Sequence, residues 1–317
     1  MFLAQEGRGT LSESSTSLRI WASGSRYFRQ YHSEPIRNEN EIYFGPKFSP
    51  DGQNIAFWMK IDDKSQVWIY NPERDQLSRF TSVGENFWPI WSPDGNAIVF
   101  PSIRAGSLNV NAYSKSYYLT EPAIPLIKSK KAIQPKLWSS DGRFLLYHQF
   151  DEESGSSIFL FDIMEGKSIP FLNESYDEGK PDFSPNNKWL VYESNETGSF
   201  EVYVTSFPGK SFKHQISSYG GNEPLWSSDG DKIYYRNDDG FYVVNVLWEG
   251  NEVSFKKPIK MFSGPFRYTH GWGRNYDLSP DGKKFITILE NDNINSLKTT
   301  GVISNFLEVV SQRKVEQ

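Results

Sequence analysis

"WPIWSPDGNAIVF", residues 88–100, joins an aromatic run to an alternating apolar run through a Ser-Pro-Asp-Gly turn. Proline presets φ at the first central turn position, aspartate can bond its own nearby backbone, and glycine supplies a positive φ. Similar turns recur along the chain at intervals of 43 to 52 residues, beginning at Ser49, Ser139, Ser184, Ser227 and Ser279. The chain is therefore an array of internal repeats.

Strand-like runs fill each repeat. IAFW from Ile55 and FLLY from Phe144 follow their turns directly, and VWIY from Val67 and IFLF from Ile158 follow a polar loop. Such short runs are rich in β-branched and aromatic residues and are bounded by Gly, Asn and Asp, which predicts strands rather than helices. A repeat of about 40 to 45 residues with four strands is typical of a propeller blade. We predict an all-β propeller of four-stranded antiparallel blades, with six blades favoured by the six turns.

The repeats divide the chain into a propeller over residues 41–306, preceded by residues 1–40 and followed by a tail, residues 307–317. The tail pattern FLEVVSQRKV fits a short helix. The first 40 residues hold strand-like runs that lack a turn of their own. Either these runs complete the sixth blade and close the ring, or they are the remnant of a seventh blade. The expected blades are residues 41–80, 84–127, 131–172, 176–218, 220–262 and 271–306.

Two further positions repeat with the turn. An aromatic or apolar residue precedes each serine, as Trp91, Trp138 and Trp226 do, and we expect these tryptophans to be buried between adjacent blades. A proline stands five residues before the turn Asp or Asn in four copies: Pro46, Pro89, Pro181 and Pro224. The third copy has its proline one place earlier, at Pro135, so that Lys136 takes the slot.

Composition narrows the function classes. The chain has 317 residues, a net charge of −5 and no cysteine, so disulfides, thiolate metal sites and a cysteine nucleophile are excluded. Charges of both signs are mixed without a long basic run, which argues against nucleic acid as a partner. No stretch approaches eighteen consecutive apolar residues, and the start lacks the pattern of a secretory signal. We therefore expect neither a transmembrane segment nor a signal peptide in this chain.

The repeat (W/F)-S-P-D-G-x-x-(I/L)-x-(F/Y) resembles that of TolB-like, WD40-like propellers. The stretch VYVTSFPGKSFKHQISSYGGNEPLWSSDGDKIYYRNDDGFYVVNV, with NYDLSPDGKKFITI and GVISNFLEVV, is more specifically similar to propeller domains attached to bacterial serine/threonine kinases and sensor proteins. The resemblance implies a sensory or docking module of a bacterial envelope or signalling protein. It suggests the periplasmic or extracytoplasmic side if the chain is part of a longer membrane protein, and the sequence itself leaves the compartment open. No kinase glycine-rich loop or His-Arg-Asp string is present.

Sequence motifs for catalysis are missing. There is no Gly-x-Ser-x-Gly elbow, and the histidines His32, His148, His214 and His270 are scattered over different repeats. A ring can still bring distant residues together, so we expect a polar channel mouth from the loops before the first strand of each blade. Its candidate binding residues are Glu85, Asn86, Glu178, Asn222, Glu223, His270, Trp272 and Arg274.

A carboxylate and histidine set at that mouth would suit a divalent metal. Ordinary polar loop residues around a wet channel are the simpler interpretation, because Lys131, Lys136 and Lys180 belong to the same positions. We therefore predict a non-catalytic module that binds a protein or peptide, with no cofactor, metal or catalytic residue. A metal-dependent sugar- or lactone-processing propeller and an accessory propeller of a peptidase are the alternatives. Partner identity, binding face and oligomeric state are left open.

Overall fold

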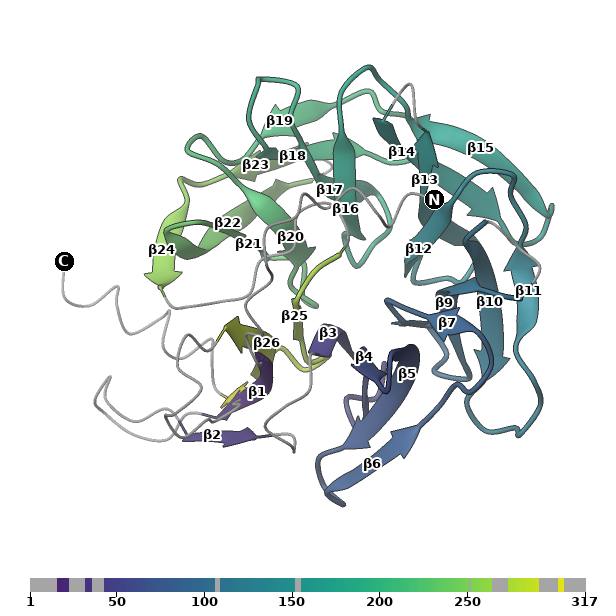
Figure 1. The fold of residues 1–317 in the computed structure, drawn as a ribbon. Coiled ribbons are helices and arrows are strands. Elements are labelled where there is room, and N and C mark those ends of the chain that lie inside the picture. The colour runs from purple at the N-terminus through teal and green to yellow at the C-terminus, as the bar shows by residue number, and fades with distance from the viewer. Residues whose placement is uncertain are drawn as a thin grey trace, which may run out of the picture.

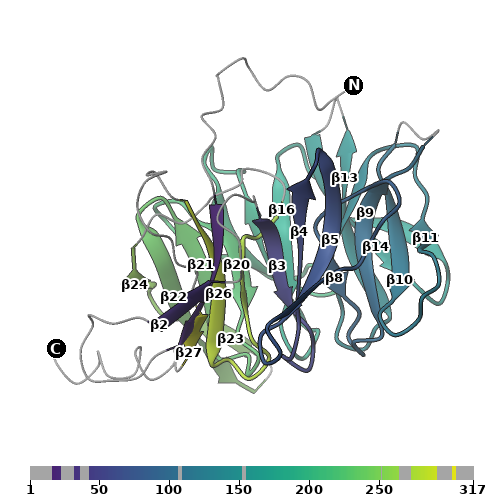
Figure 2. The same ribbon diagram turned by 60° about the horizontal axis from the view of Figure 1, so that its bottom comes forward.

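A computed structural model describes residues 16–22, 32–35, 43–105, 109–151, 155–250, 252–263, 273–290 and 302–304. The described strands form six antiparallel sheets set around a common centre, as the blades of a propeller (Figure 1). Turned on its side, the ring shows its sheets standing upright next to one another (Figure 2). No described residue lies in a helix. The prediction of an all-β propeller is confirmed.

The sheets follow one another along the chain. The first holds β3 (Tyr43–Phe48), β4 (Ile55–Ile61), β5 (Lys64–Asn71) and β6 (Gln76–Arg79). The second holds β7 (Glu85–Asn86), β8 (Ile90–Trp91), β9 (Ala97–Ile103), β10 (Asn111–Ser116) and β11 (Ile124–Ile127). The third holds β12 (Ile133–Trp138), β13 (Phe144–Asp151), β14 (Gly155–Asp162) and β15 (Lys167–Leu172).

The fourth sheet holds β16 (Glu178–Phe183), β17 (Trp189–Ser194), β18 (Glu201–Ser206) and β19 (Lys213–Gln215). The fifth holds β20 (Asn222–Trp226), β21 (Lys232–Asn237), β22 (Gly240–Glu249), β23 (Glu252–Phe255) and β24 (Ile259–Phe262). The last joins both parts of the chain: β25 (Tyr276–Leu278), β26 (Lys284–Glu290), β27 (Val302–Ser304), β1 (Thr16–Ala22) and β2 (His32–Pro35).

The last sheet shows how the ring closes. β1 pairs antiparallel with β26, from Thr16 opposite Glu290 to Trp21 opposite Phe285, and β2 lies on the far side of β1. Strands from before the first repeat thus form the outer part of the sheet whose inner strand is β25. Of the two interpretations of the first 40 residues, the pairing supports ring closure. The tail expected to be helical lies outside the described residues.

The apolar core lies between neighbouring sheets. One buried cluster joins Ala56 and Val67 of the first sheet to Trp91 and Phe100 of the second. Another joins the fourth sheet to the fifth around Trp226. Trp91 and Trp226 are 8% and 5% exposed, as expected for residues between blades, whereas Trp138 is only half-buried against its cluster.

The six turns share one hydrogen-bond pattern. In the third copy, the Ser139 hydroxyl donates to Asp141 and accepts from the backbone N–H of Phe144, while the Gly142 N–H donates to the Ser139 carbonyl. Asn186 takes the place of the aspartate in the fourth copy, and Asn187 there adopts φ 55°. The turn thus satisfies its own backbone polar groups, which explains its repetition.

The described part of the chain contains no helix with the length and apolar character needed to cross a membrane.

Candidate functional site

The inner strands are bent by a bulge just before the repeated proline. The residue that precedes that proline has a positive φ in four blades: Gly45 (58°), Trp88 (37°), Lys180 (43°) and Glu223 (55°). The pairing register shifts at the same place in the first, fourth and fifth sheets. A proline fits a bulge because it has no N–H to offer the ladder, and bulges re-aim side chains. These four positions are therefore structurally equivalent points on the wall of the central channel.

Trp88 uses this geometry to lie across the channel. A bulky residue rarely adopts a positive φ, so its conformation must be held by its surroundings. Its indole packs so closely on two glycines that a β-carbon at Gly45 would lie 2.5 Å from its Cε3 atom, and one at Gly273 would lie 2.4 Å away. It also meets the rings of Phe44 and Trp58, with centroids 6.1 Å and 6.0 Å apart. Trp88 thus connects the second blade to the first and to the last.

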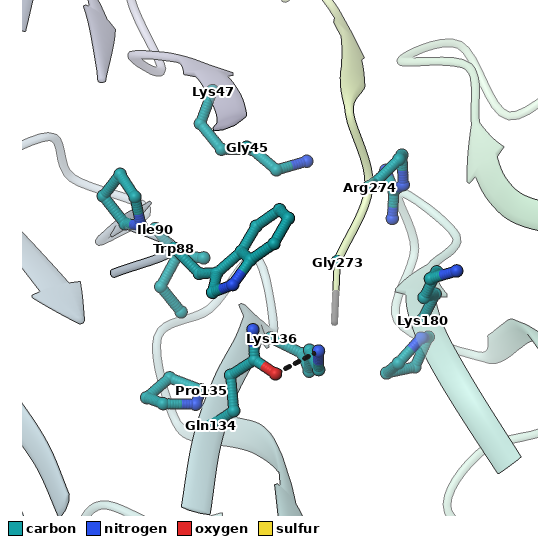
Figure 3. Close-up of a pocket in the computed structure, with 12 residues that line it drawn as sticks. Gly45, Lys47, Trp88, Ile90, Gln134, Pro135, Lys136, Lys180, Gly273 and Arg274 are labelled. Carbon is teal, nitrogen blue, oxygen red and sulfur yellow. Dashed lines mark hydrogen bonds between the residues drawn. The ribbon is translucent and has the colours of Figure 1, made fainter. Parts of the chain in front are cut away.

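A small cavity that opens to solvent lies beside the indole. Figure 3 shows cationic side chains from several blades around it. Four of the lining residues are cations: Lys47 on β3, Lys136 on β12, Lys180 on β16 and Arg274 just before β25. The other lining residues are Gly45, Trp88, Pro89, Ile90, Gln134, Pro135, Pro181 and Gly273. No carboxylate stands among these described lining residues.

Carboxylates lie behind two of the cations. Lys47 Nζ is 3.1 Å from Asp277 Oδ1, and Arg274 Nη2 is 3.5 Å from Asp182 Oδ1. The second oxygen of each aspartate accepts a backbone N–H of the next blade. Asp277 Oδ2 accepts from Phe48 at 3.0 Å, and Asp182 Oδ2 accepts from Trp226 at 2.8 Å. Each aspartate thus ties two neighbouring blades together and neutralises a channel cation.

A buried network surrounds the third cation. Lys180 Nζ lies 3.2 Å from Glu193 Oε1 and 3.8 Å from Glu223 Oε1, and Glu223 also pairs with Arg236 Nε at 2.8 Å. The Glu223 backbone N–H donates to Glu193 Oε2. Side chains this buried need such partners, because an isolated charge in the interior is costly.

The channel cations influence one another electrostatically. Burial lowers the pKa of Lys136 well below its usual value, and the nearby Lys180, Arg274 and Lys47 lower it further. Burial also lowers the pKa of Lys47, again helped by Arg274. Lys136 Nζ donates to the neutral Gln134 Oε1 at 2.8 Å. Four cationic side chains thus line one small cavity, and carboxylates outside the lining pair with three of them.

Arg274 retains donor capacity inside this cavity. Its side chain is 7% exposed, yet its Nε and Nη1 atoms are buried and have no hydrogen-bond partner among the described residues. A buried guanidinium normally satisfies most of its five donors.

Of the residues predicted from the sequence, Arg274 lines the cavity and Glu223 lies in the network beside it. Asn222, the neighbour of Glu223, pairs across the sheet with Arg236. His270 and Trp272 lie outside the described residues.

The other predicted residues lie in separate polar environments. Asn86 is fully buried between Gln66 and Ser102, to both of which it is hydrogen-bonded. Glu85 accepts the backbone N–H of Ser65 at 2.6 Å. Glu178 is 2% exposed, and burial raises its pKa to about 7. These contacts hold strands together.

Four lining residues were not among the binding residues predicted from the sequence: Lys47, Trp88, Lys136 and Lys180. The signal that could have found them was the repeated proline, because all four lie within one residue of its position in their blades.

Within the described ranges, no group of three or more His, Asp and Glu side chains is placed to hold a metal ion. His148 is 1% exposed, and burial followed by the nearby Lys136 and Lys180 lowers its pKa well below the usual value. It is therefore neutral at pH 7.

The fold and the cation-lined channel define a propeller of the kind built from Ser-Pro-Asp-Gly repeats. Residues 121–317, more than half of the chain, match the family model described as the TolB beta propeller domain. The chain belongs to this family.

Two known proteins illustrate the range of its relatives. The chain is 29% identical over 200 residues to the Tol-Pal system protein TolB of Francisella tularensis subsp. holarctica (strain OSU18), covering 61% of this chain and 46% of that protein. It is 27% identical over 155 residues to the uncharacterized peptidase YuxL of Bacillus subtilis (strain 168), covering 48% of this chain and 22% of that protein. The chain thus spans less than half of the length of either relative.

Among solved structures, an oligogalacturonate lyase from Vibrio parahaemolyticus has a TM-score of 0.58 at 13% identity, covering 93% of this chain and 84% of that chain. Similarity at this level of identity shows a shared fold.

Proposed function

We propose that this chain is a non-catalytic propeller module that binds a protein or peptide at the mouth of its central channel. One observation carries the proposal: the channel cavity offers Arg274, three lysines and the indole of Trp88 as its interaction groups. Tryptophan and arginine are enriched at binding hot spots. The described lining holds no Ser, Thr, Tyr, His, Asp or Glu, so it offers no hydroxyl nucleophile with an imidazole or carboxylate base.

The setting we propose is a bacterial envelope or signalling protein, with the propeller on the extracytoplasmic side. Membership of the TolB propeller family and the similarity to a Tol-Pal system protein support the envelope setting. A sensory role like that of kinase-attached propellers rests on the sequence resemblance alone.

Capture of partner proteins tests the proposal. The tagged chain, with and without Arg274→Gln and Trp272→Ala together, is cross-linked to extracytoplasmic proteins, and recovered proteins are quantified. Glutamine keeps a donor for Asp182, so the fold should persist by circular dichroism. We expect the double variant to lose its partners, and the exposed pair Lys256→Ala with Lys257→Ala to retain them. Equal capture by all three proteins would remove the channel mouth as the binding face.

The enzyme alternatives are tested separately. Lys136 is a cavity residue with a lowered pKa, a property shared by catalytic lysines. Purified protein is therefore assayed with oligogalacturonate, sugar lactones and peptides, with and without added Mn²⁺. We expect no turnover; turnover lost in Lys136→Gln would make the chain an enzyme and overturn the proposal.

A further inference from the structure

We propose that the channel cavity is a binding site for a single oxyanion group, held by the Arg274 guanidinium together with Lys136. The group is a carboxylate, phosphate or sulfate, carried by a free anion or by an acidic peptide. Only the peptide source rests on the proposed function; the free anion is an independent possibility.

The first argument is the composition of the wall. Four cations converge on the cavity from the first, third, fourth and last sheets, and its described lining contains no carboxylate. Aspartates 182 and 277 lie behind Arg274 and Lys47, and their second oxygens are engaged by backbone N–H groups. The anionic groups therefore lie outside the described lining, in which every charged side chain is a cation. Figure 3 shows these four cationic side chains around the cavity.

The second argument is the unused hydrogen-bonding capacity of Arg274. Two of its nitrogen atoms, Nε and Nη1, are buried without a partner among the described residues, although the side chain is 93% buried. Leaving a buried donor of a charged group unsatisfied costs more than leaving a neutral one. Each free guanidinium N–H is a strong donor to an oxygen of a carboxylate or phosphate. An oxyanion would supply what this side chain lacks.

The third argument is mutual repulsion. Burial is the largest cause of the lowered pKa of Lys136 and of Lys47, and neighbouring cations add to it: Lys180, Arg274 and Lys47 at Lys136, and Arg274 at Lys47. An anion placed among them would relieve that repulsion. Trp88 packs tightly against the glycines beside it and forms one side wall of the cavity.

Calorimetric titration of the whole chain with inorganic phosphate, at fixed ionic strength set by NaCl, tests the site directly. Variants Lys136→Gln and Lys136→Arg form a matched pair, because only the second keeps the charge. Arg274→Lys keeps a charge near Asp182 but removes the forked donors. Lys256→Ala with Lys257→Ala lowers surface charge far from the channel lining. Circular dichroism and the melting temperature check that every variant is folded.

We expect one phosphate per chain, with affinity reduced about tenfold or more in Lys136→Gln and Arg274→Lys. Lys136→Arg and the surface pair should bind as the parent does. If phosphate does not bind, capped peptides that differ only in Asp or Asn are titrated, and binding of the Asp peptide alone supports the site with a peptide source. Failure of both probes, or equal binding in all variants, overturns the inference. Equal partner capture by the parent and the Arg274→Gln/Trp272→Ala variant, with phosphate binding by the parent intact, would count against the proposed function instead.

Discussion

Gly273 lies so close to Trp88 that a β-carbon at residue 273 would be 2.4 Å from Cε3 of the indole. The two residues belong to the last and the second blade, and their contact crosses the ring. Glycine at this position is therefore required by the tryptophan.

This relationship predicts a non-additive pair of mutations. Gly273→Ala should lower the free energy of unfolding by about 1–3 kcal/mol, the usual cost of overpacking. In a Trp88→Gly background the clash is absent, and the same substitution should cost much less. Urea unfolding of the four proteins measures the coupling. Equal costs in both backgrounds would mean that the indole does not occupy the channel.

Glu178 predicts a dependence of stability on pH. Burial raises its pKa to about 7 from an ordinary value of 4.5, so the folded protein holds the proton more tightly than the unfolded chain. The contribution of protonated Glu178 to the free energy of unfolding is complete below about pH 4.5. It declines as the pH rises toward 7 and is lost above pH 7. The raised pKa corresponds to a decline of about 3 kcal/mol in the free energy of unfolding over this pH range.

Glu178→Gln should remove this decline, because glutamine does not titrate. The free energy of unfolding of variant and parent is measured at pH 5 and at pH 8. Relative to the parent, the variant should be more stable at pH 8 than at pH 5. Glu165→Gln, at an exposed position, is the control. A difference that is the same at both pH values would contradict the raised pKa.

Substitution of a turn glycine tests the cost of a positive φ separately from any effect of side-chain packing. Gly142 has φ 73°, and a β-carbon there would meet nothing within 4 Å. Gly142→Ala should then cost about 1–2 kcal/mol from the left-handed conformation alone. Gly142→Asn should cost less, because Asn187 already adopts φ 55° in the fourth turn. Thermal unfolding ranks the three proteins, and an alanine variant as stable as the parent would disprove the assignment.

The tryptophans before the turns should differ in importance. Trp226 is 5% exposed in the cluster between the fourth and fifth sheets, and Trp226→Ala should cost about 3–5 kcal/mol. Trp138 is half-buried, so Trp138→Ala should cost about half as much. Denaturant unfolding gives both values. The reverse order would indicate that burial does not set the cost at this position.

Deletion of residues 1–35 should expose the edge of β26 that β1 covers. Unpaired strand edges promote association with other chains. We expect the shortened protein to self-associate in size-exclusion chromatography, whereas a deletion of residues 1–12, which keeps β1 and β2, should not. A monomeric 36–317 protein with the parent's melting temperature would show that closure does not depend on these strands.

The sequence predicted the repeated elements well because local chemistry determines them. Ser139, Asp141 and Gly142 form their turn from contacts within a few residues, so its pattern is visible in a single chain. The cavity was harder to predict, because it depends on where a bulge in each inner strand directs one side chain. In the sequence, Lys136 and Lys180 argue only against a metal site. Ring closure places them on the same cavity wall as Arg274, and no local sequence pattern predicts this arrangement.

The pairing of β1 with β26 also has a consequence for biosynthesis. At ribosomal rates of about 5–20 residues per second, β26 is synthesised on the order of tens of seconds after β1. Throughout that interval a nascent chain carries several finished sheets together with a β1–β2 pair whose other edge has no partner. The last sheet can therefore be completed only after β26 emerges, and the uncovered edge of β1 would need chaperone protection longest when translation is slow.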